Sequence, residues 1–421
     1  MTGEKIFTKK DMEIILSKDE GLARYFAKIK AIIEEYMDMD EEFYTLVSLW
    51  IVGTYFHKQF PSYPYLFFNA MKGSGKTRIL KIVASLSKNG KVVGSMTDAV
   101  LFRTAKQRTL CIDELEGINA KEKGSLRLLL NSAYKKGLGV ERLTKRKTKD
   151  GEEQIIEEFE VYCPIAMANI RGMENVLADR CISIVLEKSS NNRIVKLMED
   201  FGDNMEFKTT GGGLQRLTEN IKDNSNIFGH VIQAWNSYSK NNKQNIVNSV
   251  NIVNKTDNTD NIDDFTILFQ KIDNTNLSGR DLELFFPLFV LADMIGEDIL
   301  DKTMKTAQKV VKLRKESDRE ENKDIRLIEF IAQSNYEGYI DLSRIAREFS
   351  EFYEEDVRYN TSNSISRALK RLKLIIDRRN TGSKRQARID VLKAQKKLLM
   401  FKEPDEIDFL KSGIKETLKN E

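Results

Sequence analysis

The chain passes from the apolar run Tyr65-Leu66-Phe67-Phe68 through Asn69 into the octapeptide Ala70-Met71-Lys72-Gly73-Ser74-Gly75-Lys76-Thr77. The octapeptide matches the phosphate-loop pattern, except that Ala70 stands where the first glycine is usual. Gly73 and Gly75 let the backbone turn its N–H groups inward, and a helix starting near Lys76 points the positive end of its dipole at the same anion. The stretch predicts a strand, an anion-binding loop and a helix.

The side chains of this loop suit a nucleoside triphosphate. We expect Gly73, Ser74 and Gly75 to line the phosphates, Lys76 to reach the β- and γ-phosphates, and Thr77 to be a ligand of Mg²⁺. ATP and Mg²⁺ are therefore the expected cofactors. The alternative is a chance match in a glycine-containing turn, which the strand before and the helix after disfavour. Ala70 is acceptable if its position needs a small residue more than a positive φ angle.

A pair of acidic residues follows the second apolar run after the phosphate loop. Residues 109–112 read as a strand that ends in Asp113-Glu114, at the edge where doubly wound sheets bind ligands. Asp113 would hold the magnesium through water, and Glu114 would orient and polarise the attacking water. The alternative is a solvated acidic pair between a strand and a loop. The phosphate loop upstream favours the catalytic interpretation, and the paired acids favour a hydrolase over a kinase.

Two further polar residues flank later strands. Residues 161–168 form a candidate strand that runs into Asn169, whose amide could hydrogen-bond the attacking water or the γ-phosphate. The alternative is that Asn169 only forms a turn. Arg180 directly precedes the last candidate strand, residues 181–187. Its alternative role is an ion pair with Asp179 or another surface acid.

Outward from the loop, residues 61–190 alternate short apolar runs with helical stretches such as 77–87. The runs 65–68, 92–94, 109–112, 161–168 and 181–187 predict an α/β fold with a parallel sheet wrapped by helices. Residues 1–60 have apolar side chains at helical spacing and predict a helical preface. Residues 191–311 predict a helical lid, with a flexible Asn-rich insertion at about 239–262.

A separate C-terminal domain is predicted for residues 324–401, followed by a tail, residues 402–421. Ile325, Ile328 and Ile331 have helical spacing, and two more helical segments follow at 342–353 and 362–374. Two strands, 375–379 and 386–391, come next, and three helices with a hairpin resemble a winged helix. Its third helix and its wing carry basic residues that could meet DNA phosphates: Arg367, Lys370, Arg371, Arg379, Lys384 and Arg385. The alternative is a winged helix that contacts protein.

The order of these motifs resembles the minichromosome maintenance (MCM) helicase branch of the AAA+ P-loop NTPases, over about residues 60–190. The resemblance implies that Asn169 is the sensor 1 residue. It also implies that Arg180 is an arginine finger for the nucleotide of a neighbouring subunit in a ring. Residues 277–283 look like the sensor 2 helix, whose arginine, here Arg280, contacts the nucleotide from the lid. The stretches CIDELEG (111–117) and NVLADRCISIVLEK (175–188) are also similar to AAA+ ATPases of plasmids and viruses.

Between the acidic pair and Asn169, residues 139–161 predict a β-hairpin with an Asp-Gly turn near its tip. In the MCM branch the corresponding hairpin faces the central pore. There, Lys145, Arg146, Lys147 and Lys149 would contact the phosphates of a single-stranded or forked DNA, without base specificity. The alternative is a solvated charged loop.

The amino-acid composition excludes some other kinds of protein and site. The 68 basic and 64 acidic residues leave a formal charge of +4, which says little about partners. Two histidines are too few for a histidine-based zinc site or a Ser-His-Asp triad. The three cysteines lie in apolar runs, which fits a reducing cytoplasm, and we expect no membrane anchor.

The resulting expectation is a ring-forming, Mg²⁺-dependent ATPase that acts as a DNA helicase or translocase in the replication of a mobile element. The resemblance to the MCM branch implies that the ring is a hexamer. A primase or other replication proteins would be its partners. One alternative is a DNA-bound initiator or loader that switches assembly without processive unwinding. Another is a regulatory ATPase that remodels protein.

Overall fold

The computed structural model describes residues 8–18, 21–94, 98–113, 124–148, 151–169, 175–199, 201, 204–221, 227–248, 263–321, 323–353, 361–382 and 384–398. The chain divides into two units, Met1–Val310 and Val311–Glu421. Of the predicted site residues, Glu114 and Lys149 lie outside the described residues. For Lys145, Arg146, Lys147 and Lys384 the backbone is described and the side chain is not.

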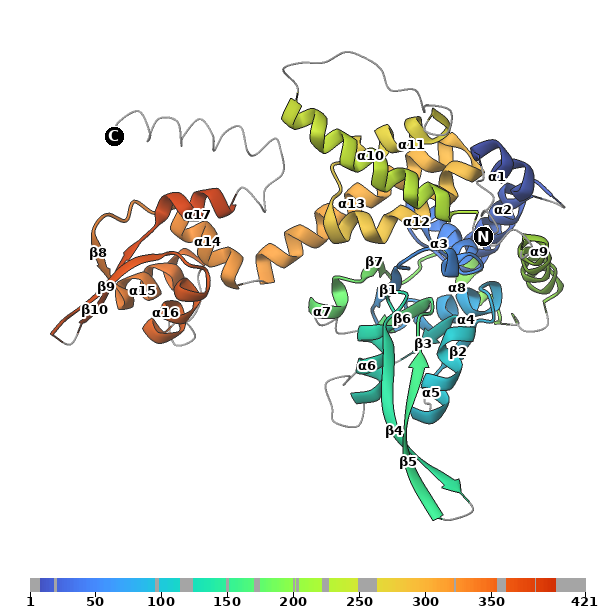
Figure 1. The fold of residues 1–421 in the computed structure, drawn as a ribbon, viewed down its shortest axis with the longest axis horizontal. Helices are drawn as coiled ribbons and strands as arrows, with labels where there is room; N and C mark the ends of the chain where they lie inside the picture. Colours follow the sequence, from blue (N-terminus) through green and yellow to red (C-terminus); the bar gives the residue numbers. More distant parts are fainter. Residues whose placement is uncertain are drawn as a thin grey trace. The chain divides into compact units, whose positions relative to one another are not determined.

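The first unit contains a five-stranded parallel sheet with the strand order β2-β3-β6-β1-β7 (Figure 1). The strands are β1 (Tyr65–Ala70), β2 (Lys91–Val93), β3 (Leu110–Ile112), β6 (Ile165–Asn169) and β7 (Cys181–Leu186). Strands β3 and β6 are buried along their whole length, and β1 nearly so. Parallel strands covered on both faces need continuous apolar runs, so the predicted α/β sheet is confirmed.

Strand β6 starts four residues later than the sequence predicts, at Ile165. Pro164 explains the difference. Its carbonyl accepts the N–H of Leu110 at 3.0 Å, but proline has no N–H of its own to donate to a ladder. Regular pairing therefore begins only after Pro164.

The helical preface consists of α1 (Lys9–Leu16), α2 (Leu22–Tyr36) and α3 (Glu41–Gly53), followed by a short 3₁₀ helix, His57–Gln59. The buried face of α2 includes Leu22, Tyr25, Phe26, Ile29 and Ile32, which are the residues whose spacing predicted it. Helix α3 is buried from Phe43 to Gly53 and packs on α2 and α12. The preface is therefore part of the core of the first unit.

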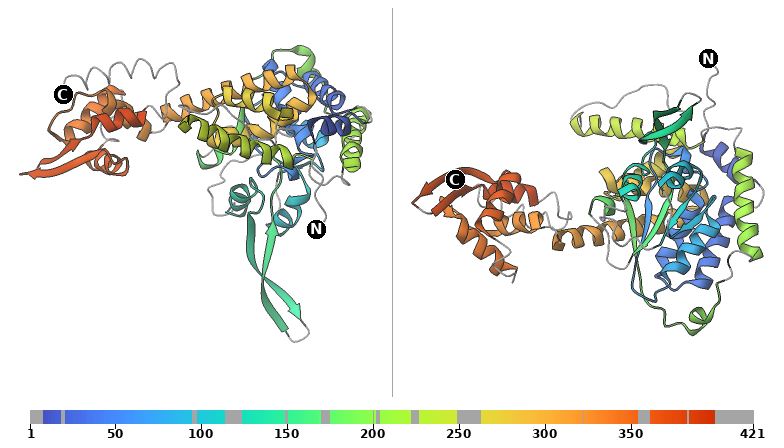
Figure 2. Two further views of the ribbon diagram at one scale, coloured as in Figure 1. Left: turned by 45° about the horizontal axis from the view of Figure 1, so that its top comes forward. Right: turned by 90° about the horizontal axis from the view of Figure 1, so that it is seen from below.

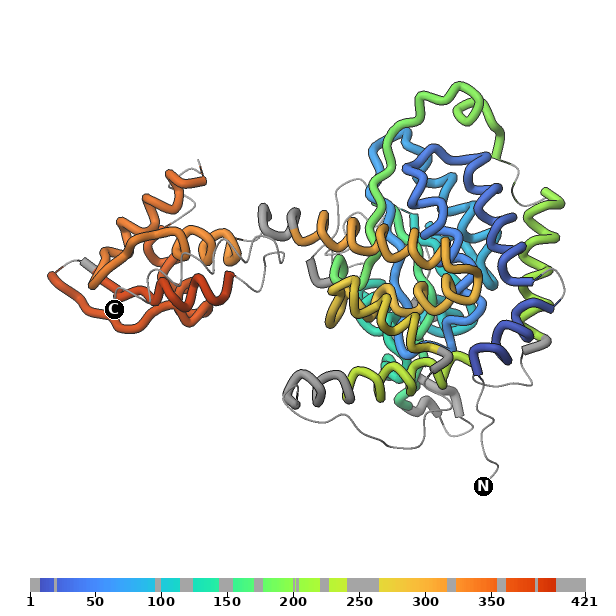
Figure 3. Tube along the Cα trace, turned by 90° about the horizontal axis from the view of Figure 1, so that it is seen from above, coloured from blue at the N-terminus to red at the C-terminus, as the bar shows by residue number. Residues whose placement is uncertain are grey.

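The other helices of the first unit are α4 (Lys76–Leu86), α5 (Asp98–Thr104), α6 (Gly124–Ser132), α7 (Asn175–Ala178), α8 (Asn192–Lys196), α9 (Met205–Ile221), α10 (Gly229–Asn248), α11 (Asp263–Asn274), α12 (Gly279–Ile295) and α13 (Glu297–Glu321), which continues into the second unit; a 3₁₀ helix spans Ala105–Gln107. Helix α9 lies beside α2 (Figure 3). No helix in the described part of the chain has the length and apolar character that crossing a membrane requires.

Helix α10 continues through residues 239–248, which the sequence assigned to a flexible insertion. The backbone of these residues is helical, which the sequence did not predict. The run contains no proline or glycine to end a helix, despite its many asparagines. The rest of the insertion, residues 249–262, lies outside the described residues.

A β-hairpin made of β4 (Gly139–Thr148) and β5 (Gly151–Glu160) forms a separate two-stranded sheet. It projects away from the five-stranded sheet in Figure 1 and in the left view of Figure 2. At its base Val140 and Phe159 are buried, and the Phe159 ring lies 6.0 Å from the ring of Phe102 in α5. The predicted hairpin is confirmed.

The second unit contains a three-stranded antiparallel sheet, β8-β10-β9, with helices. Its elements are α14 (Lys323–Gln333), β8 (Tyr339–Asp341), α15 (Leu342–Phe352), α16 (Ser362–Arg371), β9 (Ile375–Thr381), β10 (Lys384–Ile389) and α17 (Val391–Leu398). Ile331, Ile345, Phe349 and Leu369 are in its core. Helix α16 ends earlier than predicted because Lys373 adopts a φ of 55°. Strand β8 and helix α17 were not predicted.

Candidate nucleotide-binding site

The loop between β1 and α4 has the backbone that its glycines predict. Gly73 and Gly75 have φ angles of 83° and 85°, which side chains with a Cβ rarely adopt. Ala70 is the last residue of β1, is 1% exposed and pairs with Leu186 of β7. It has no positive φ angle. The first position of the motif therefore needs a small residue, and alanine meets that need.

The loop and the acidic strand meet at the carboxyl edge of the sheet. The Thr77 hydroxyl donates a hydrogen bond of 2.7 Å to Oδ2 of Asp113, and Nζ of Lys76 lies 3.9 Å from Oδ1 of the same carboxylate. The side chains of Lys76 and Asp113 are 17% and 16% exposed, so solvent reaches the site. The structure thus brings Asp113 to two predicted residues, Lys76 and Thr77, that precede it by at least 36 positions.

The order of the strands explains why the phosphate loop lies near Asp113, and it also explains the position of Asn169. Strand β6 lies between β1 and β3, with Asn169 paired to Asn69 and Met167 paired to Ile112. Because parallel strands end at one edge, Asn169 lies between the phosphate loop and Asp113. Asn169 is 8% exposed. Its position fits a residue that contacts a group held between the loop and the acidic strand.

The pair Thr77 and Asp113 is a suitable donor set for Mg²⁺. A hydroxyl and a carboxylate in hydrogen-bond contact are two of the oxygen ligands that this ion prefers, and it commonly takes the rest from phosphates and water. Among the described residues, no cluster of three or more His, Cys, Asp and Glu side chains could hold a metal without such help. Glu114, which follows Asp113 in the chain, lies outside the described residues.

A cavity of about 170 Å³ adjoins the loop. Three parts of the chain line it: the end of the preface helix α2, the loop with the start of α4, and the segment after β7. The lining residues are Tyr36, Met37, Asp38, Gly73, Ser74, Gly75, Arg78, Lys188, Ser189, Ile194, Val195 and Glu199. Only the glycines and Ser74 of this set were predicted, because the others are remote in sequence or, like Arg78, carry no motif. The cavity therefore opens directly beside the loop that the sequence predicts to bind phosphates.

The two predicted arginines lie away from this loop. The Tyr65 N–H, at the start of β1, donates to the Arg180 carbonyl at 2.9 Å, whereas the loop follows the other end of β1. The guanidinium of Arg280 lies 4.9 Å from the ring centroid of Tyr134, and that ring lies 5.9 Å from the ring of Tyr65. Strand β1 has six residues, a length of about 17 Å. Arg180 and Arg280 therefore share the end of the sheet opposite the chain's own loop.

Arg280 is held in place by its neighbours. Its Nη1 donates to Glu283 at 2.8 Å, and Glu283 also pairs with Lys135 at 2.7 Å. The Arg280 side chain remains 33% exposed. Arg280 thus lies away from the chain's own loop, and its contact with a nucleotide stays a prediction.

The basic residues of the hairpin face an acidic strand. The pairing places Arg142 opposite Glu157, Arg146 opposite Glu153 and Lys147 opposite Glu152, while Lys145 lies opposite Gln154. Cross-strand neighbours of opposite charge attract each other. The sequence shows both charge runs, but only the register shows that they lie side by side.

In the second unit the basic residues differ in their contacts. Arg367 and Lys370 are exposed on α16, whereas Arg371 binds Asp324 through two hydrogen bonds of 2.9 and 2.5 Å. Arg379 lies 4.0 Å from the ring centroid of Tyr339, and Arg385 donates to Asn363 of α16 at 2.7 Å. The contact between Arg385 and Asn363 joins β10 to α16. The exposed cations form a basic surface on these two elements.

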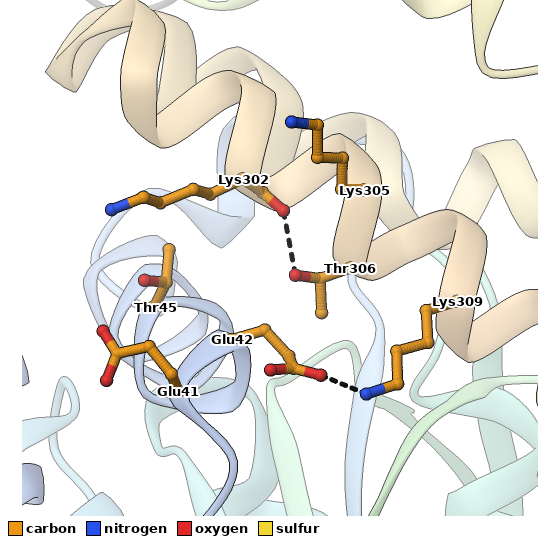
Figure 4. A pocket seen from close by; sticks show the side chains of 7 residues that line it. All are labelled: Glu41, Glu42, Thr45, Lys302, Lys305, Thr306 and Lys309. Atoms are coloured by element: carbon orange, nitrogen blue, oxygen red, sulfur yellow. Dashed lines mark hydrogen bonds and ion pairs between the residues drawn. The ribbon is translucent and has the colours of Figure 1, made fainter.

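A second cavity, of about 290 Å³, lies between α3 and α13 (Figure 4). Its lining residues are Glu41, Glu42, Thr45, Lys302, Lys305, Thr306 and Lys309. Glu42 pairs with Lys309, and Glu41 pairs with Lys30 at 2.9 Å. None of the lining residues belongs to the phosphate loop or the acidic strand. This cavity is therefore separate from the candidate site.

No protein-family model matches the chain, and no curated protein matches it in sequence.

Proposed function

We propose that the chain is a Mg²⁺-dependent ATPase of the AAA+ type, with residues 61–190 as its ATPase core and residues 191–311 as its lid. The observation that carries the proposal is the contact between Thr77 and Asp113 at the end of the phosphate loop. A metal-binding hydroxyl and a metal-binding carboxylate meet there, beside a lysine and two glycines with left-handed backbone.

In this proposal the loop N–H groups and Lys76 bind the phosphates, and Thr77 and Asp113 hold the ion. Bound Mg²⁺ would neutralise charge on the β- and γ-phosphates. Asn169 would orient the attacking water by hydrogen bonding. Glu114, adjacent to Asp113, would accept a proton from that water as general base.

The positions of Arg180 and Arg280 support assembly into a homo-oligomeric ring. Both lie at the end of the sheet opposite their own loop, so a nucleotide that they contact would belong to a neighbouring subunit. A guanidinium that reaches the γ-phosphate from a neighbour stabilises negative charge in the transition state. Hydrolysis would then depend on assembly.

DNA is the proposed partner, and the second unit is its proposed winged-helix domain. Arg367 and Lys370 on α16 and the wing residues Arg379 and Arg385 provide positive charge for phosphates. Motion along a strand would make the protein a DNA helicase or translocase in the replication of a mobile element, with Lys145, Arg146, Lys147 and Lys149 in contact with the strand.

A second candidate, a DNA-bound initiator or loader, is favoured by one observation. The acidic strand β5 lies against the basic strand β4, which lowers the net positive charge that the hairpin offers to DNA. A loader does not require hairpin contact with a threaded strand. Alanine at Lys145, Arg146 and Lys147 separates the two, because it should abolish unwinding by a helicase and leave a loader active.

The test of the ATPase is turnover by the wild type and by Glu114→Gln, with and without single-stranded DNA, over a range of protein concentrations. We expect turnover that rises with DNA and with concentration and disappears in the variant. Turnover independent of DNA would favour a switch or a protein-remodelling ATPase. ATP binding without any turnover would refute the proposal that the chain is an ATP-driven motor.

A further inference from the structure

Arg78, the residue after Thr77, connects three parts of the chain that lie apart in sequence. Its Nη1 donates to the carbonyl of Ile194 at 2.8 Å and to that of Tyr36 at 3.5 Å. Its Nη2 donates to the carbonyl of Leu197 at 3.0 Å. Tyr36 ends the preface helix α2, and residues 194 and 197 follow β7. One guanidinium on α4 therefore holds both neighbouring segments.

The positive charge of the Arg78 side chain is balanced by a neighbouring carboxylate, that of Glu199. Arg78 is 16% exposed, and its Nε donates to Glu199 at 3.4 Å. Glu199 also accepts a hydrogen bond of 2.7 Å from Lys81, one turn further along α4. Although partial burial works against it, these two cations lower the pKa of the Glu199 carboxyl. The carboxylate is thus held ionised beside Arg78.

The segments that Arg78 holds are walls of the cavity beside the phosphate loop. Tyr36, Ile194 and Glu199 all line that cavity, as Arg78 does. A second hydrogen bond joins the same two segments, because the Ser189 hydroxyl donates to the Asp38 carboxylate at 2.7 Å. The phosphate loop forms the remaining side through Gly73, Ser74 and Gly75. Without the guanidinium, three carbonyls from two segments would lose their common donor.

We propose that Arg78 is a positioning residue that fixes the walls of this cavity and so determines the affinity for the base and ribose of the nucleotide. The phosphates are bound by other groups, so their affinity does not depend on Arg78. This inference rests on the proposed nucleotide site and adds to it a separate place for the nucleoside. Arg78 carries no motif, because its role depends on carbonyl groups that any residue could provide.

The test measures binding of MgATP and of magnesium tripolyphosphate, which has the phosphates without the nucleoside, by titration calorimetry. The proteins are the wild type, Arg78→Met, Arg78→Lys and the control Lys81→Ala. Lys81 shares the partner Glu199 but does not line the cavity. Arg78→Met keeps an unbranched aliphatic stem and removes all the hydrogen-bond donors of the side chain. Thermal melting of each variant checks that it is folded.

We expect Arg78→Met to weaken ATP binding by about tenfold or more, equivalent to about 1.4 kcal/mol, and to leave tripolyphosphate within about twofold of the wild type. Arg78→Lys should also weaken ATP, because an ammonium cannot reach all three carbonyls from one point. Lys81→Ala should bind both ligands as the wild type does.

Two results would overturn the inference. Unchanged ATP binding by Arg78→Met would show that the walls need no guanidinium. Equal loss of ATP and tripolyphosphate would show that Arg78 supports only the phosphate loop. A wild type that binds neither ligand would instead refute the nucleotide site itself, and the inference with it.

Discussion

At the scale of single residues, the phosphate loop shows which atoms its motif needs. Gly73 and Gly75 have left-handed backbone, and Ala70 replaces a glycine without strain because it ends a buried strand. The chemistry then depends on one contact between distant residues, the hydrogen bond from Thr77 to Asp113. Changing either partner should affect turnover without disturbing the loop.

We expect Asp113→Asn to lower kcat/KM for MgATP by roughly 100-fold or more, because the amide cannot supply the negative charge that attracts the ion. The Thr77 hydroxyl could still donate to the amide oxygen, so the fold should persist. Turnover measured against Mg²⁺ concentration tests this. A variant with the wild-type Mg²⁺ dependence would show that Asp113 is not at the metal.

A buried histidine should make stability depend on pH. His57 is 5% exposed, and its Nδ1–H donates to the Thr54 carbonyl at 2.8 Å. Among the described residues Nε2 has no hydrogen-bond partner. Burial lowers the pKa of His57 from 6.5 to about 3, and nearby lysines act in the same direction. The folded protein therefore keeps this imidazole neutral under mildly acidic conditions.

Below pH 6.5 the unfolded chain binds a proton at His57 and the folded chain does not, until the pH approaches 3. The contribution of His57 to stability is thus complete above pH 6.5 and is lost as pH falls, by up to about 1.4 kcal/mol per pH unit. Denaturant unfolding of the wild type and His57→Phe between pH 7 and 5 measures the difference. Parallel stability curves would contradict it.

At the scale of elements, α9 contains three consecutive glycines, Gly211, Gly212 and Gly213, inside a helix. Glycine costs roughly 0.5–1 kcal/mol relative to alanine at such positions. A Cβ on Gly213 would overlap the ring of Tyr25 in α2, whereas one on Gly212 would meet only Nη1 of Arg216, at 3.8 Å. Close packing of α9 on the preface thus requires one of these glycines.

We expect Gly213→Ala to destabilise the protein by about 1–3 kcal/mol, because the Tyr25 ring must move. Gly212→Ala should stabilise it by about 0.5–1 kcal/mol through reduced freedom of the unfolded chain. Equilibrium unfolding in urea compares the two. The same sign for both substitutions would show that α9 does not pack on Tyr25 in this way.

On α16, two adjacent basic residues should differ in their effect on DNA binding. Lys370 is exposed, whereas Arg371 is held by Asp324. Lys370→Ala should weaken binding to all sequences and reduce the slope of log K against log salt by about 1. Arg371→Ala should change the slope less. Fluorescence anisotropy over a salt series tests this, and equal slopes for wild type and Lys370→Ala would exclude a phosphate contact.

At the scale of the whole molecule, the two ends of the parallel sheet have different roles in the proposed ATPase. The phosphate loop, Asp113 and Asn169 share the carboxyl edge, while Arg180 and Arg280 share the other end. In the proposed ATPase, a single chain would therefore contain both halves of a site without bringing them together. Mixing two inactive variants can therefore test whether an arginine of one subunit acts on the site of another.

Lys76→Ala should lose the phosphate site and keep the arginine, whereas Arg180→Ala should lose the arginine and keep the phosphate site. Each variant alone should have almost no turnover, since each lacks one half of every site. A mixture should recover activity where Arg180 of a Lys76→Ala chain meets the intact loop of an Arg180→Ala chain. A mixture as inactive as its components would argue against action between subunits.

The sequence by itself determined the strand, loop and helix around residues 65–86, the buried strand before Asp113, and the helices of the preface. These features depend on local backbone freedom and on the spacing of apolar residues. The sequence did not predict that β6 starts at Ile165, that β8 exists, or that α10 continues to Asn248. The limits of these elements depend on hydrogen-bond partners elsewhere in the chain.

Only the tertiary structure decided which of the candidate residues meet. The order β3-β6-β1 places Asn169 and Asp113 beside the loop, and the register of the hairpin places acidic β5 against basic β4. The same fold places Arg280 far from the loop and gives Arg78 its carbonyl partners. These contacts join residues far apart in the chain, and a carbonyl acceptor has no side chain that could identify it in a sequence. The physical reason is that spacing along a chain specifies local geometry, while strand order and packing specify proximity.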